Sequence, residues 1–98
     1  MDQISTDELL KFAKSVEGKT LRRNKEFTVV VTEDSLVYIP VATNTRTKND
    51  RHCVDEICKE FSKTNNDSPS HYVKTLKAWH ASYSLTLIHM CLGKAKTD

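Results

Sequence analysis

The first apolar repeat along the chain predicts an α-helix over about residues 6 to 17. Its apolar residues recur at i, i+3, i+4 and i+7 and form one stripe: Leu9, Phe12, Ala13 and Val16. Ser5 and Glu8 have the spacing of a capping box, in which a hydroxyl and a carboxylate satisfy backbone donors at a helix start. Gly18 follows the repeat and is the residue type that commonly ends a helix.

Two runs of β-branched and aromatic residues, at 26–32 and 36–41, predict an antiparallel β-hairpin with a three-residue turn between them. One face of the first strand carries large apolar side chains: Phe27, Val29 and Val31. Neither face of the hairpin is cleanly polar, and a two-stranded sheet alone is marginal in water. We therefore expect helices to cover at least one face of the hairpin.

The segments beside the hairpin are shorter and more polar. Residues 20–23 would add a short third strand, whereas residues 42–49 are rich in Thr and Asn and predict a loop. A second helix is expected after that loop, with Asn49 or Asp50 as its cap and an end near Lys63. The apolar stripe of this helix comprises Val54, Ile57, Cys58 and Phe61.

The last helix has a clear start, with Ser68 as the expected cap and Pro69 at the first helical position. From there to about Leu92 the chain contains neither Gly nor Pro. A continuous helix of that length would measure about 35 Å, which is long for so small a domain. Either the helix is broken near residues 78–81, or its far end projects and needs a partner.

The predicted order of elements is α-β-β-α-α. This is an α+β fold in a single small domain over residues 1–98, with the antiparallel hairpin packed against helices. We expect residues 93–98 to form a disordered tail. The predicted core comprises Phe12, Val16, Phe27, Val29, Val31, Tyr38, Ile57, Phe61, Leu76, Tyr83 and Leu87.

Composition fits a globular protein, with 38% hydrophobic and 29% charged residues and a net charge of +2. The three cysteines cannot all pair within one chain, so we expect free thiols. The first residues lack the basic and apolar regions of a signal peptide, and no apolar run approaches a membrane span. A cytoplasmic protein without a membrane partner is the resulting expectation.

Basic residues flank both strands of the predicted hairpin. Because the start of the first strand lies beside the end of the second, they would converge into one positive end, opposite a turn that holds Glu33 and Asp34. The candidate nucleic-acid-binding residues are Arg22, Arg23, Lys25, Arg46, Lys48 and Arg51. Arginine is a preferred reader of phosphates and base edges. However, no aromatic residues are interleaved for base stacking. A solvated basic face is the alternative.

Catalytic and metal-binding patterns are weak in this sequence. His71, His80 and His89 recur every nine residues, which is not the i, i+4 spacing of helical metal ligands. Cys53 and Cys58 are five residues apart, which is neither a zinc nor a redox spacing. Only two glycines occur, so a glycine-rich phosphate loop is excluded. We therefore expect a non-enzymatic protein with no cofactor and no metal.

The aromatic residues of the last helix have two interpretations. Trp79, Tyr83, Leu87 and Met90 form either part of the core or the interface of a homo-oligomer, most simply a dimer. Trp, Tyr and Met are enriched at the centres of interfaces. The sequence thus favours a homo-oligomeric interaction module, with a nucleic-acid-binding accessory protein as the alternative.

A pattern over residues 20 to 90 resembles small bacterial proteins encoded on mobile elements, including integron gene-cassette products of unassigned function. The residues that carry it are Thr20, Leu21, Arg22, Arg23, Phe27, Val29, Val31, Leu36, Tyr38, Pro40, Ala81, Ser82 and Tyr83. The resemblance implies a bacterial, cytoplasmic accessory protein. The resemblance does not imply a catalytic residue or a ligand for this chain.

Overall fold

Four strands form one antiparallel sheet in the order β1-β2-β3-β4 in the computed structural model, which describes residues 3–22, 26–33 and 35–93. The strands are β1 (Leu21–Arg22), β2 (Glu26–Thr32), β3 (Ser35–Pro40) and β4 (Thr47–Asn49). The helices are α1 (Thr6–Ser15), α2 (Arg51–Thr64), α3 (Pro69–Leu76) and α4 (Ala81–Cys91). The fold is α+β, as predicted. The predicted tail lies mostly outside the described residues.

The central hairpin has the predicted register, with Val29 opposite Tyr38 and Val31 opposite Leu36. The short strand β1 pairs with β2, as the sequence suggested. The prediction of a loop throughout 42–49 is wrong, because β4 pairs with β3 through three residues. The outer edge of β3 offers backbone groups that need partners, and β4 satisfies them despite its polar sequence.

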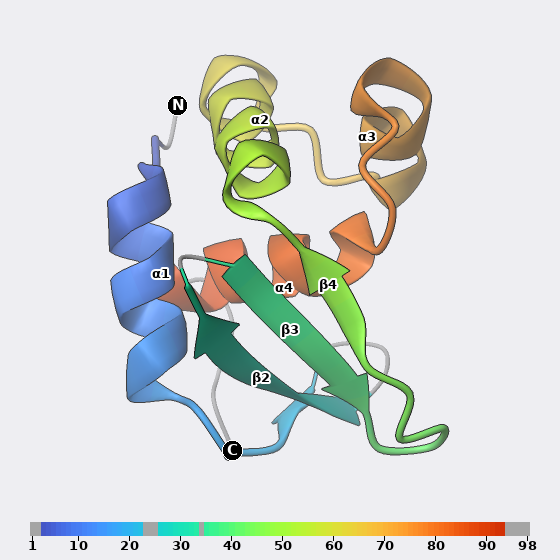
Figure 1. The fold of residues 1–98 in the computed structure, drawn as a ribbon. Coiled ribbons are helices and arrows are strands. Elements are labelled where there is room, and N and C mark those ends of the chain that lie inside the picture. The colour runs from blue at the N-terminus through green and yellow to red at the C-terminus, as the bar shows by residue number, and fades with distance from the viewer. Residues whose placement is uncertain (1–2, 23–25, 34, 94–98) are drawn as a thin grey trace.

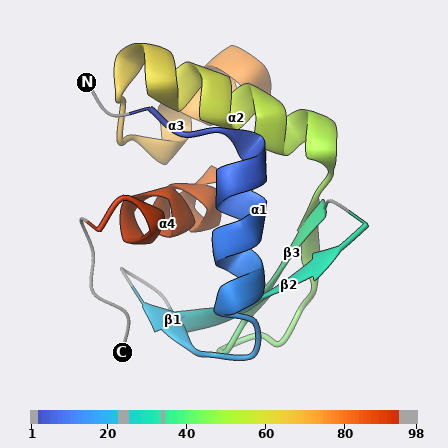
Figure 2. The ribbon, with the colours of Figure 1, turned by 90° about the vertical axis from the view of Figure 1, so that its left-hand side faces the viewer.

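Within the described residues, helices cover one face of the sheet and leave the other without a helix (Figures 1 and 2). Figure 1 shows α4 behind the strands, and Figure 2 shows α1 and α4 on the same side of the sheet. Phe27, Val29 and Tyr38 point to that side and are at most 1% exposed. Val30 and Ile39 alternate with them on the other face and remain partly exposed. The hydrophobic core therefore lies between the sheet and the helices.

The long final helix is broken, as the sequence allowed. The chain leaves α3 through Lys77 and enters α4 through His80, and both residues have left-handed backbones with φ of 53° and 64°. Every residue from Ser84 to Ile88 is buried. Helix α4 is thus packed into the domain. Its C-terminal end does not project as an apolar helix that needs a partner.

Local capping follows the sequence closely at two helices. The Ser5 hydroxyl and the Glu8 carboxylate form the capping box at α1, and Asp50 accepts a hydrogen bond from the Cys53 backbone N–H at α2. Pro69 takes the first position of α3, but Ser68 makes no side-chain capping bond. Its hydroxyl lies 2.9 Å from that of Ser70 instead.

Most of the predicted core is buried. The confirmed residues, at 5% exposure or less, are Val16, Phe27, Val29, Tyr38, Ile57, Phe61 and Leu87. The other four are only partly buried and pack against the core from its margin: Phe12, Val31, Leu76 and Tyr83.

A buried chain of hydrogen bonds joins the sheet to the final helix. The Ser84 hydroxyl donates to Asn49 Oδ1 at 3.1 Å, so Tyr38, whose hydroxyl lies 2.5 Å from Ser84 Oγ, donates to Ser84. Asn49 Nδ2 donates to the Trp79 carbonyl at 3.0 Å. Asn49 is thus a core residue at the end of β4 that fixes the α3–α4 linker.

Replacing Asn49 by alanine should therefore lower the free energy of unfolding by about 1–3 kcal/mol. The substitution leaves the part-buried Trp79 carbonyl and the buried Ser84 hydroxyl without Asn49 as a partner. Thr45→Ala, at an exposed position before β4, should change stability by less than about 0.5 kcal/mol. Urea unfolding of both variants measures the difference, and equal stabilities would contradict a role for Asn49.

Candidate functional site

An apolar hollow opens where β2 begins and β3 ends. Its volume is about 480 Å³, and it is lined by Glu26, Pro40, Val41, Ala42, Thr43 and Tyr83. The wall from Pro40 to Thr43 is a tight turn, closed by a 2.7 Å hydrogen bond from the Asn44 N–H to the Pro40 carbonyl. Asn44 has φ of 54°, a conformation that asparagine tolerates better than most residues. The hollow therefore has a well-defined wall.

Tyr83 also lines the hollow and is held by a cluster of rings. Its ring centroid lies 4.7 Å from Phe27 and 5.3 Å from Tyr38, both on the inner face of the sheet. His80 stacks at 6.4 Å, with an interplanar angle of 29°. These separations are typical of favourable aromatic pairs. The packing fixes the half-buried Tyr83 ring at the surface rather than in the core.

Trp79 precedes this cluster and is 64% exposed, while Val41 on the hollow is 53% exposed. They are the two exposed large apolar side chains in the part of the chain that the structure describes. The Trp79 backbone is anchored by Asn49, and it lies between left-handed Lys77 and His80. A large apolar ring is thus held outward from a fixed backbone.

The four residues predicted as an interface divide into two pairs. Trp79 is exposed, and the half-buried Tyr83 lines the hollow. Leu87 and Met90 are 0% and 5% exposed and belong to the core, so the core interpretation is the correct one for them. Sequence reasoning missed Pro40, Val41 and Ala42. Their only signal was an apolar run that continues past the end of a strand.

The predicted convergence of basic residues is wrong for Lys48 and Arg51. In the register of the sheet, Lys48 lies opposite Val37 in the middle of β3. Arg51 follows β4 toward the turn between β2 and β3, and its guanidinium lies 3.0 Å from Asp7. Both residues therefore lie away from the end where β2 begins.

The remaining basic residues do not form one described cluster. Arg46 is exposed just before β4, whereas Arg22 is in β1 at the opposite edge of the sheet, with β2 and β3 between them. The side chain of Arg22 and the whole of Arg23 and Lys25 lie outside the described residues. Nucleic-acid binding by the six residues stays a prediction.

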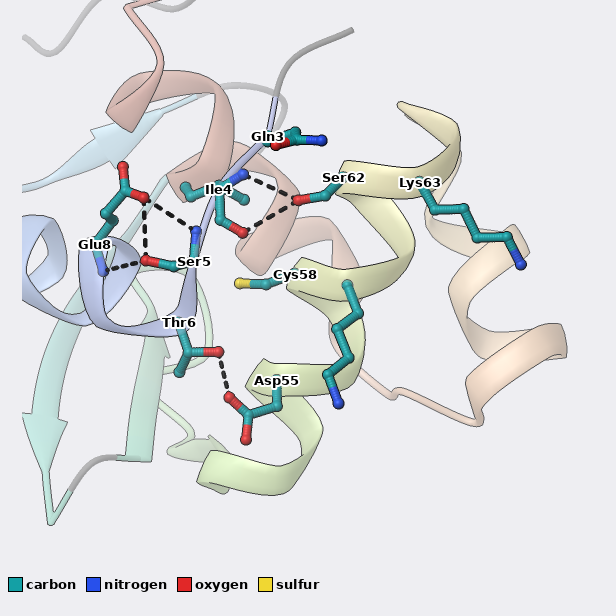
Figure 3. A pocket seen from close by; sticks show the side chains of 10 residues that line it. Gln3, Ile4, Ser5, Thr6, Glu8, Asp55, Cys58, Ser62 and Lys63 are labelled. Carbon is teal, nitrogen blue, oxygen red and sulfur yellow. Dashed lines mark hydrogen bonds between the residues drawn. The ribbon is translucent and has the colours of Figure 1, made fainter.

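A second and larger groove lies between the start of α1 and α2 (Figure 3). Its volume is about 630 Å³, and its lining includes three acidic or thiol side chains, Glu8, Asp55 and Cys58. Glu8 is occupied by the capping box, and Asp55 accepts a hydrogen bond from the Thr6 hydroxyl. The Thr6–Asp55 bond thus links α1 to α2, whereas Glu8 acts within the capping box of α1.

Ser62 of α2 adds a second contact, to the segment just before α1. Its hydroxyl accepts from the Ile4 N–H at 2.9 Å and donates to the Ile4 carbonyl at 3.1 Å, as Figure 3 shows. Burial raises the pKa of Cys58 to about 12, so its thiol is protonated at neutral pH. The groove therefore presents no activated nucleophile.

The other candidate residues also make structural contacts. His71 Nε2 lies 2.6 Å from Glu60, which joins α3 to α2, and His89 Nε2 lies 2.5 Å from Asp67. Burial raises the pKa of Cys53 and of Cys91, and both thiols are free. No group of three or more metal-ligating side chains occurs within residues 3–22, 26–33 and 35–93.

The chain matches no family model, no curated protein and no solved structure. Among the described helices, none has both the length and the apolar character needed to cross a membrane.

Proposed function

We propose that the protein is a non-catalytic interaction module that associates with copies of itself. The observation that carries this proposal is the exposure of two large apolar side chains: Val41, which lines the hollow, and Trp79, whose neighbour His80 stacks on Tyr83. Trp and Tyr are the residues most enriched at the energetic centres of interfaces. An exposed tryptophan with an anchored backbone loses little conformational freedom when a partner covers it.

The chemistry of the other cavities supports a non-catalytic role. The hydroxyls and carboxylates that line the α1–α2 groove are engaged in bonds within the protein. Ser5 and Glu8 bond each other in the capping box, Thr6 donates to Asp55, and Ser62 bonds the Ile4 backbone. A nucleophilic thiol needs a lowered pKa, whereas the pKa values of Cys53, Cys58 and Cys91 are all raised. The resemblance to integron gene-cassette products is in keeping with an accessory role of this kind.

Self-association should appear as a concentration-dependent molar mass. Light scattering and sedimentation between about 5 and 300 μM should show a rise from 11.2 kDa toward twice that value, since interfaces of modest size give micromolar dissociation constants. A mass of 11.2 kDa throughout, including at ~100 μM, would refute the proposal.

A further inference from the structure

We infer that the Trp79 ring of one copy occupies the Tyr83 hollow of a second copy, and that the second copy returns the same contact. This inference rests on the proposed self-association and assigns its surface. An interface in which the same patch serves both subunits requires a projecting group and a receiving group on one chain. Trp79 and the hollow supply these two parts.

The two parts are connected through a single residue, His80. Trp79 adjoins His80 in the chain, and the His80 ring stacks on Tyr83, which forms one wall of the hollow. Trp79 is 64% exposed, so its ring does not fill the hollow of its own chain. A two-fold axis between copies would bring each Trp79 to the hollow of the other.

Size and chemistry suit the hollow to an indole ring. Its volume of about 480 Å³ is within the range of sites that hold small ligands. Pro40, Val41 and Ala42 supply an apolar wall, and the half-buried Tyr83 supplies an aromatic one. An incoming ring can therefore pair with Tyr83 in an offset or edge-on arrangement.

Charge is complementary across the proposed contact. Glu26 lines the hollow, and Lys77 is exposed two residues before Trp79. Because Lys77 is only two residues from Trp79, seating Trp79 in the hollow would bring Lys77 of each copy within reach of Glu26 of the other, although Glu26 also interacts within its own chain. Opposite charges at the rim favour this pairing over others and make it weaken with salt.

The expected dimer is weak and reversible. Each tryptophan buries roughly 150–250 Å² on insertion. The total area buried by two such insertions and the walls that receive them is below roughly 1,200 Å². Interfaces of that size are typical of transient complexes. We therefore expect a micromolar dissociation constant.

Trp79 is the single tryptophan of the chain, so its fluorescence reports directly on the contact. Its emission should shift to shorter wavelength, and its quenching by iodide should fall, over the same concentration range in which the mass doubles. Trp79→Ala should weaken the dimer at least tenfold. The Trp79 side chain is exposed, so this variant should fold normally, as circular dichroism would verify.

Two further variants separate this contact from other surfaces. Val30→Lys alters the uncovered face of the sheet and should leave the dissociation constant within about twofold of the unmodified protein. Lys77→Glu and Glu26→Lys should each weaken the dimer, and their combination should recover most of the loss.

The outcomes distinguish this inference from the proposal on which it rests. A dimer that survives Trp79→Ala with unchanged emission would overturn the Trp79 contact while self-association stands. A dimer abolished by Val30→Lys alone would assign the interface to the sheet face instead. A monomer at every concentration would overturn both.

Discussion

Truncation of Phe27 to alanine should lower the free energy of unfolding by about 3–5 kcal/mol. Phe27 is 1% exposed on the inner face of β2. Its ring centroid lies 6.0 Å from that of Tyr38 and 4.7 Å from that of Tyr83. The alanine variant lacks the favourable free energy of burying the ring. It also leaves a cavity, which further destabilises the folded state. Urea or thermal unfolding measures this loss.

Phe12→Ala is the matched control for this substitution. Phe12 is the same residue type, but it is only partly buried, at the margin of the core on α1. Less apolar surface is lost there, and solvent can fill the space. A loss at Phe12 as large as that at Phe27 would show that the core is not centred on the inner face of the sheet.

The parts of the fold that depend on short-range chemistry could be predicted from the sequence. The capping box of Ser5 and Glu8 is formed within four residues, and the alternation of Phe27 and Val29 fixes the inner face of β2. The hairpin register follows from the same alternation. Such elements need no knowledge of distant parts of the chain.

The strand β4 could not be predicted, because its pairing is a long-range effect. Its three residues show no apolar alternation, and they pair because β3 needs a partner at its edge. Asn49 was expected in a loop or as a cap. It is instead buried, because Ser84 and the Trp79 carbonyl, 35 and 30 residues away, satisfy its amide.

The candidate site was only half predicted, and the reason lies in the helix break. A helical repeat drawn through residues 69–92 places Trp79 on one face with Leu87. The left-handed residues Lys77 and His80 interrupt the repeat, so Trp79 belongs to a linker and Leu87 to a buried helix. Neither residue is a glycine, so the sequence carried little sign of these conformations.

Alkaline conditions should unfold the protein, with Cys58 as a principal cause. Its side chain is 2% exposed, and burial raises its pKa from 9.0 to about 12. The unfolded thiol therefore loses its proton from about pH 9, while the folded thiol retains it. The unfolded state binds fewer protons, so stability falls as pH rises. A shift of this size corresponds to about 4 kcal/mol lost between pH 9 and 12.

Cys58→Ala should flatten this dependence, because the variant has no thiol to ionise there. Urea unfolding in reductant, from pH 8 to 11.5, should show the variant losing up to about 1.4 kcal/mol less per pH unit above pH 9. Burial also raises the pKa of Tyr38 and of Tyr72, so these phenols ionise first in the unfolded state and should lower the stability of both proteins above about pH 10. Cys53→Ala is the matched control, since that thiol is only partly buried and should affect the slope less. Equal slopes for Cys58→Ala and the unmodified protein would exclude the buried thiol as a source of alkaline instability.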